Sequence, residues 1–245
     1  MRVLRICGFI TCLVCLAGTH SLAQTDSDTQ RSLSGTAELS FVSTSGNSDT
    51  ETIGLGAELQ YEPGRWRTAT KLKFIRSEAN NTLNAHSFNA ILQGTRQMSG
   101  RIGLYSKAGY LRDRFAGIDD RYAAEGGVSW QALLESAHQV TAEGGFGWTR
   151  ELRATAEHRT LGTANSSVSY FWLFSETNEL RNEASATFVV DDSNDWRFTN
   201  DLSLSAALNT LFSLKLTHQL GFLNDPVPGF EKTDIKVSAA VVAKF

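Results

Sequence analysis

Hydrophobic and polar residues alternate most regularly at the C-terminus of the chain. Between residues 235 and 245, six apolar side chains occupy every second position: Ile235, Val237, Ala239, Val241, Ala243 and Phe245. Because successive side chains of a β-strand point to opposite faces, this spacing predicts a strand whose apolar face ends on an aromatic residue. Such a strand is typical of bacterial outer-membrane β-barrels, in which the apolar face contacts lipid. We expect Val241, Ala243 and Phe245 to form the assembly signal that the barrel-assembly machinery binds.

The same alternation recurs along the chain from Leu33 onward. It divides the sequence into twelve segments, each close to the ~9–11 residues that a tilted membrane strand requires. No apolar run after Ala23 is long enough for a membrane helix. Because lipid cannot satisfy unpaired backbone groups, a membrane protein with this pattern must be a closed barrel. The sequence therefore predicts an all-β fold, an antiparallel transmembrane β-barrel of about 12 strands over residues 33–245.

The links between the predicted strands fall into two alternating sets. Short links such as Glu62–Arg65 alternate with longer polar ones such as Asp113–Arg121 and Glu151–Thr163. Short periplasmic turns and longer external loops are the expected asymmetry of outer-membrane barrels. Asp191–Asp195 belongs to the second set. It lacks the glycine and the distal glutamate of a calcium-binding EF-hand loop, so we expect a solvated external turn there.

The N-terminus has the features of a secretory signal peptide. Basic residues precede a short apolar run, and the small residues Ser21 and Ala23 allow cleavage before Gln24. We expect residues 1–23 to be removed, residues 24–32 to form a polar tail, and the mature protein to reach the bacterial outer membrane. All three cysteines lie in the signal peptide, which excludes a disulfide framework in the mature chain: Cys7, Cys12 and Cys15.

The polar faces of the predicted strands carry charges of both signs. In a soluble periplasmic ligand-binding barrel, the apolar residues would face inward and the charges outward. The signal peptide, the terminal Phe245 and the alternating links favour the opposite orientation. Seven charged residues are then candidates for a lumen that either conducts small ions or is filled by salt bridges: Lys71, Lys73, Lys107, Glu125, Glu143, Asp201 and Lys215.

Three segments between the predicted strands resemble a known family. They are Gly46–Thr50, Tyr110–Asp119 and Asp225–Asp234, of which the last, with its Pro-x-Pro-Gly-x-Glu-Lys-Thr-Asp sequence, is the most specific. Together they resemble the YdiY-like family of salt-induced outer membrane proteins, which is otherwise a domain of unknown function. The resemblance covers the whole mature domain. It implies an outer-membrane barrel and carries over no catalytic residues.

No sequence motif indicates catalysis. The mature chain has neither the H-E-x-x-H sequence of zinc proteases nor the G-x-S-x-G elbow of α/β-hydrolases. His218 lies among apolar residues, which makes it the candidate for a phospholipase-like site on the outer barrel wall. A neutral histidine that faces lipid is the simpler interpretation, because the sequence places no serine beside it. We expect no enzymatic activity, no cofactor and no metal site.

The densest charge cluster has two alternative interpretations. It consists of three arginines and three aspartates: Arg112, Arg114, Arg121, Asp113, Asp119 and Asp120. These residues either pair within a loop or constrict and gate a pore. Of the two, we favour the ion-paired loop.

The expected function is passive. A narrow channel for small solutes or ions and a structural envelope role under osmotic or salt stress both agree with the pattern. Twelve strands lie between the filled eight-stranded barrel and the open sixteen-stranded porin. An outer-membrane hydrolase and a soluble periplasmic ligand-binding barrel are the alternatives. Expected partners are outer-membrane lipid and lipopolysaccharide. The net charge of −3 falls to about −5 once Arg2 and Arg5 are removed, which offers no footprint for nucleic acid.

Overall fold

The structure is a computed structural model that describes residues 32–44, 50–79, 82–114 and 116–245. The signal peptide and all but the last residue of the predicted tail lie outside the described residues. No helix within these ranges has the length and apolar character needed to cross a membrane. The described chain folds into twelve strands: β1 (Ser32–Thr44), β2 (Thr50–Glu62), β3 (Trp66–Ala79), β4 (Thr82–Gln97), β5 (Ile102–Asp113), β6 (Ile118–Leu134), β7 (His138–Arg153), β8 (His158–Leu173), β9 (Asn178–Val189), β10 (Asp192–Ala207), β11 (Phe212–Leu223) and β12 (Thr233–Lys244).

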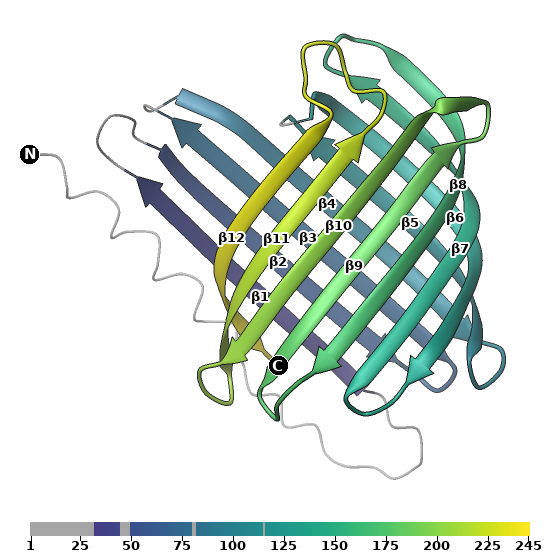
Figure 1. Ribbon diagram of the computed structural model, residues 1–245, viewed down its shortest axis with the longest axis vertical. Coiled ribbons are helices and arrows are strands. Elements are labelled where there is room, and N and C mark those ends of the chain that lie inside the picture. Colours follow the sequence, from purple (N-terminus) through teal and green to yellow (C-terminus); the bar gives the residue numbers. More distant parts are fainter. Residues whose placement is uncertain (1–31, 45–49, 80–81, 115) are drawn as a thin grey trace, which may run out of the picture.

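These strands form one closed barrel. Each strand pairs antiparallel with its neighbours in the sequence, and β12 pairs with β1 to complete the ring (Figure 1). The predicted fold class is confirmed. We call the end where β12 finishes the base of the barrel, and the opposite end, where residues 224–232 join β11 to β12, the mouth.

The outer surface of the barrel is apolar. Large hydrophobic side chains face outward along the strands, and Phe146 and Val237 are 74% and 72% exposed. A soluble barrel would bury such residues, whereas lipid solvates them at no cost. The side chains that alternate with them are small or polar and face the interior, and several are buried, among them Thr149, Thr163 and Ser203. The orientation of the two faces therefore does not fit the soluble alternative.

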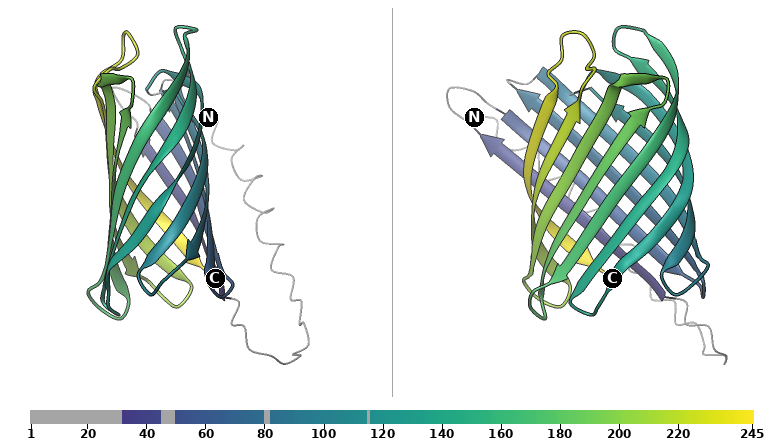
Figure 2. Two further views of the ribbon diagram at one scale, coloured as in Figure 1. Left: turned by 90° about the vertical axis from the view of Figure 1, so that its right-hand side faces the viewer. Right: turned by 45° about the vertical axis from the view of Figure 1, so that its right-hand side comes forward.

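The barrel is oval in cross-section. It is narrower in the left view of Figure 2 than in Figure 1, so two opposite walls approach each other across the lumen. This shape places inward-facing side chains of non-neighbouring strands within contact distance.

At the mouth, two predicted links turn out to be mostly strand. In place of Asp113–Arg121, residues 114–117 alone join β5 to β6, and in place of Glu151–Thr163, residues 154–157 join β7 to β8. The prediction of long loops at these positions is wrong. Beyond the lipid, both faces of a strand meet polar surroundings, so the strand continues without the apolar alternation that marked it in the sequence.

The predicted turn Asp191–Asp195 is corrected in the same way. Strand β10 begins at Asp192, and Asp195 is only 4% exposed, so it is not a solvated turn residue. The difference in length between links at the base and at the mouth is consequently small, apart from the nine residues 224–232.

The ring closes where Phe245 lies on Gly35. The two residues exchange backbone hydrogen bonds, with the Gly35 amide 2.8 Å from the Phe245 carbonyl and the Phe245 amide 3.0 Å from the Gly35 carbonyl. A Cβ at Gly35 would overlap the phenyl ring of Phe245 and the side chain of Leu59. Glycine at this position therefore lets the terminal aromatic residue pack directly on the backbone of β1.

Candidate functional site

The lumen is the candidate functional site. It holds a cavity of about 910 Å³ that reaches from Glu62 and Arg67 near the base to Ala116 and Ile118 near the mouth. Alternation of side chains along each strand sends every second residue into this space. Most of the residues that line it are charged or carry amides and hydroxyls, so the cavity is suited to water and polar solutes.

Five of the seven predicted lumen residues line this cavity: Lys71, Lys73, Lys107, Glu143 and Asp201. The other two make ion pairs with inward-facing partners. Glu125 lies 2.8 Å from the Lys107 ammonium, and Lys215 lies 2.8 Å from Glu38 on β1. The structure thus brings all seven to the inner face, and most of them are engaged with a partner on another strand.

Polar contacts span the lumen between opposite walls. The Lys71 ammonium on β3 lies 2.7 Å from the Glu183 carboxylate on β9, six places away around the ring of strands. The Lys73 ammonium donates to the Gln219 side-chain oxygen on β11 over 2.6 Å. These two contacts cross the short dimension of the oval and narrow the path along the barrel axis.

A second group of contacts surrounds Lys107. Its ammonium lies between Glu125 at 2.8 Å and Glu143 at 3.6 Å, and it sits over the ring of Tyr105. The Gln93 amide donates to Glu143 over 2.8 Å. Four neighbouring strands, β4 to β7, are joined in this way, and this part of the wall holds one ammonium group between two carboxylates.

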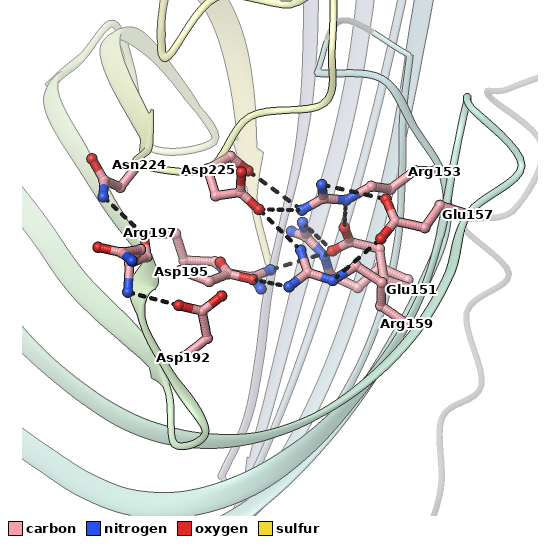
Figure 3. A network of polar contacts seen from close by, with 11 residues as sticks. Glu151, Arg153, Glu157, Arg159, Asp192, Asp195, Arg197, Asn224 and Asp225 are labelled. Carbon is pink, nitrogen blue, oxygen red and sulfur yellow. Dashed lines mark hydrogen bonds and ion pairs between the residues drawn. The ribbon is translucent and has the colours of Figure 1, made fainter.

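The mouth holds the most buried charges in the described residues. Glu151 is 1% exposed and accepts hydrogen bonds from Arg121 at 2.7 Å and Arg153 at 2.8 Å, with Arg197 at 3.6 Å. Close by, Arg159 pairs with Asp195 at 2.8 Å. Figure 3 shows Glu151, Arg153 and Arg159 beside one another at the mouth, together with Asp195 and Arg197. We call Arg121 and these five residues the arginine cluster.

The link between β11 and β12 folds over the arginine cluster. Asp225 in this link lies 3.3 Å from Arg159 and 3.6 Å from Arg153 (Figure 3). Val227 is 2% exposed, and a Cβ at Gly117 between β5 and β6 would overlap the ring of Phe230. The link therefore reaches across the mouth from one wall to the other.

Glu151 is ionised over the whole physiological range. Arg150, its neighbour, is exposed on the outer face two residues beyond Trp148, so Glu151 lies past the apolar belt. Burial raises the pKa of Glu151, but Arg121, Arg197 and Arg153 outweigh it and bring the pKa from 4.5 to about 2. The carboxylate thus stabilises the folded mouth as an anion.

We expect Glu151→Gln to destabilise the folded barrel by about 3 kcal/mol at pH 7, since a fall of about 2.5 pKa units corresponds to that free energy. The depressed pKa contributes fully above pH 4.5, and the contribution disappears as the pH falls towards 2. Heat-modifiable gel migration at a series of pH values measures this. Glu157→Gln is the control, because Glu157 is half exposed and lies 3.7 Å from Arg153. Equal losses in the two variants would contradict the prediction.

The arginine cluster was not found from the sequence. All of its members except Arg197 fall in stretches that the alternation assigned to external links, and no motif connects them. The cluster that the sequence did single out is divided between the two faces of the sheet. Arg112 pairs with Asp120 at 2.8 Å on the outer face, whereas Arg121 pairs with Glu151 inside. Arg114 also pairs with Asp119, at 3.8 Å. Two of the three arginines therefore pair within the cluster, as the favoured interpretation expects, although all of its members except Arg114 lie on β5 and β6 and not in a loop.

His218 faces outward from β11. Its register partners on the adjoining strands are Leu202 and Val237, neither of which supplies a nucleophile or an acid. Within the described ranges, no group of three or more histidine, aspartate and glutamate side chains is arranged to hold a metal ion.

A family model matches the chain over residues 37–245. The family is described as "Protein of unknown function, DUF481". The chain belongs to this family. The match confirms the resemblance that the three segments between predicted strands indicated. No curated protein matches the sequence.

Solved outer-membrane barrels share the fold. The NanC porin is 9% identical with a TM-score of 0.53, and the alignment covers 86% of this chain and 98% of the porin. An outer membrane channel from Pseudomonas putida is also 9% identical, with a TM-score of 0.51 and coverage of 87% and 95%. At these identities, the likeness concerns the fold alone.

Proposed function

We propose that the protein is an outer-membrane channel for small solutes or ions. The observation that carries this is the polar cavity of about 910 Å³ inside a closed barrel with an apolar outer surface. An apolar exterior requires lipid around the barrel, and a polar interior provides a path for solutes that lipid excludes. The porin and the channel that share the fold are compatible with this function.

The cross-lumen contacts restrict the solute to a small one. Lys71 with Glu183 and Lys73 with Gln219 divide the lumen where its walls are closest. Charged rings and constrictions of this kind decide which ions pass through a pore. The candidate lumen residues thus act as the selectivity-determining part of the channel.

A structural envelope role under osmotic or salt stress is the second candidate. The contacts of residues 224–232 across the mouth favour it, because a barrel that is bridged both at its mouth and within its lumen is rigid. In this role the charges stabilise the barrel and conduct nothing.

Location follows from the same features. In this proposal, residues 1–23 direct secretion and are removed, the base faces the periplasm, and the mouth contacts lipopolysaccharide. The C-terminal strand binds the barrel-assembly machinery through Val241, Ala243 and Phe245, and the protein has no catalytic activity. Recovery of the mature chain as a soluble periplasmic protein would contradict this location, whereas heat-modifiable migration in the outer-membrane fraction supports it.

Recording from a planar bilayer tests the channel. We expect the purified mature protein to give discrete conductance steps. The double variant Lys71→Gln with Glu183→Gln should raise the unitary conductance severalfold, because it removes a bridge across the lumen. Replacing Arg112 and Asp120 by glutamine and asparagine removes an ion pair of the outer face and should leave the conductance unchanged. Absence of steps from protein that migrates as folded would favour the structural role.

A further inference from the structure

The barrel closes along only part of the boundary between β1 and β12. From the Gly35 and Phe245 pair, the register runs through Thr36 with Lys244 and ends at Ser40 with Ala240. Beyond this point β1 continues to Thr44 beside β2, and β12 extends back to Thr233 beside β11. Figure 1 and the right view of Figure 2 show β1 and β12 diverging towards the mouth. We call this splayed part the open seam.

Backbone groups point into the open seam. Because Gly35 and Phe245 exchange both hydrogen bonds, every second residue from there points its N–H and C=O at the opposite strand. In β1 the next such residue after the ladder is Phe41, and in β12 they are Ala239 and Val237. Such groups are costly in hydrocarbon without a polar partner, and unpaired strand edges are consequently avoided within lipid.

The open seam lies within the apolar belt. Val237 and Ile235 on its outer side are 72% and 62% exposed, and Phe41 across from them is 59% exposed. Val237 is in register with His218, which lies between Leu216 and Leu220 on the outer face of β11. An opening here therefore faces acyl chains in the half of the membrane nearer the mouth.

The inner side of the open seam adjoins the lumen cavity. Asp234 and Lys236 alternate with the outward residues of β12, and both line the cavity. The Lys236 ammonium lies 3.2 Å from Asp113 on β5, so polar side chains stand directly behind the unpaired edge. Apolar side chains outside and charged ones inside define a site with two distinct ends.

We propose that the open seam is a lateral opening that joins the lumen to the membrane and admits amphiphiles. The acyl chain of the ligand lies among Phe41, Ile235 and Val237. Its polar head group occupies the lumen near Lys236 and Asp234 and satisfies the backbone groups of the seam. The inference deepens the channel proposed above and rests on it, because it requires a lumen open to polar groups.

Quenching by lipid tests the opening directly. The mature chain has no cysteine, so Ser238→Cys and Thr217→Cys each carry one fluorescent label in otherwise unchanged protein. The two residues are register partners, but Ser238 borders the open seam whereas Thr217 lies between paired strands. In vesicles of phosphatidylcholine with brominated acyl chains, we expect the label at 238 to be quenched severalfold more than that at 217. Equal, weak quenching overturns the proposal.

Disulfide formation provides a second measurement. Leu39→Cys with Val241→Cys lies in the ladder and should link under mild oxidation. Phe41→Cys with Ala239→Cys is the next pair that a continued ladder would form, and it should link at least tenfold more slowly. Equal rates of disulfide formation would show that the seam is closed. A disulfide-linked dimer of the single variant Val237→Cys would show that the strand edges of the seam pair with a second copy of the chain. Either result overturns the proposal.

The bilayer recording separates this inference from the channel. Protein that conducts ions but shows a closed seam retains the channel and loses the lateral opening. If the label at 238 is quenched by lipid but the protein does not conduct ions, the lumen is not a path along the barrel axis. The lateral opening then connects the lumen with the membrane only. Folding of every variant is confirmed by heat-modifiable migration before either assay.

Discussion

Charge reversal at Lys71 and Lys73 should turn the lumen cation-selective by at least about tenfold. The two ammonium groups lie where the walls of the oval are closest, and Lys71 neutralises Glu183 over 2.7 Å. After reversal, Glu183 faces a carboxylate in place of its partner. At an effective dielectric constant of roughly 20, one charge acts on an ion ~8 Å away with about 2 kcal/mol, which exceeds the 1.4 kcal/mol of a tenfold preference. The reversal potential in a salt gradient measures the change.

A charge swap provides the matched control. The variant Lys71→Glu with Glu183→Lys restores the opposite signs at the same two positions. It should return the reversal potential close to that of the wild type, since the bridge is rebuilt with its direction exchanged. Unchanged selectivity in the reversed variant would place the conducting path elsewhere. A wild-type barrel that folds but never conducts would contradict the channel hypothesis and favour the structural role.

Deleting Phe245 should lower the folded fraction in the outer membrane by about tenfold while secretion stays intact. The residue makes both hydrogen bonds with Gly35, and its ring packs where any other side chain at Gly35 would stand. Without it, the last paired position of the closing boundary is lost, and this boundary already has the shortest register of the barrel. A shift from heat-modifiable to unfolded migration in membrane fractions measures the loss.

A comparison in vitro separates closure of the barrel from recognition by the assembly machinery. Phe245→Ala retains the backbone hydrogen bonds and removes the ring. If the aromatic ring is an assembly signal, this variant folds into lipid vesicles at the wild-type rate but fails in cells, and Phe245→Tyr restores folding in cells. Slow folding in both settings would assign the ring to closure. Normal amounts of folded deletion variant in cells would contradict either role.

The barrel could be predicted from the sequence because lipid contacts one face of each strand, so that every second residue within the membrane is apolar. The same reasoning failed at the mouth, where β7 and β8 extend past the belt with polar residues on both faces. Glu151 and Arg159 were therefore assigned to a link, although strand alternation would have placed both on the inner face. Cross-lumen partners were beyond sequence reasoning for another reason. Lys71 and Glu183 are 112 residues apart, and their meeting depends on the oval shape of the closed ring.

The ion pairs across the lumen constrain which substitutions this sequence can accept in evolution. A substitution at Lys71 removes the ammonium group that faces the Glu183 carboxylate at 2.7 Å from the opposite wall. Relatives that preserve the oval cross-section should therefore replace both members of a pair together or neither. Correlated substitutions between strands that are not hydrogen-bonded to each other would then reveal, from the sequences of the family alone, which walls of the lumen face each other.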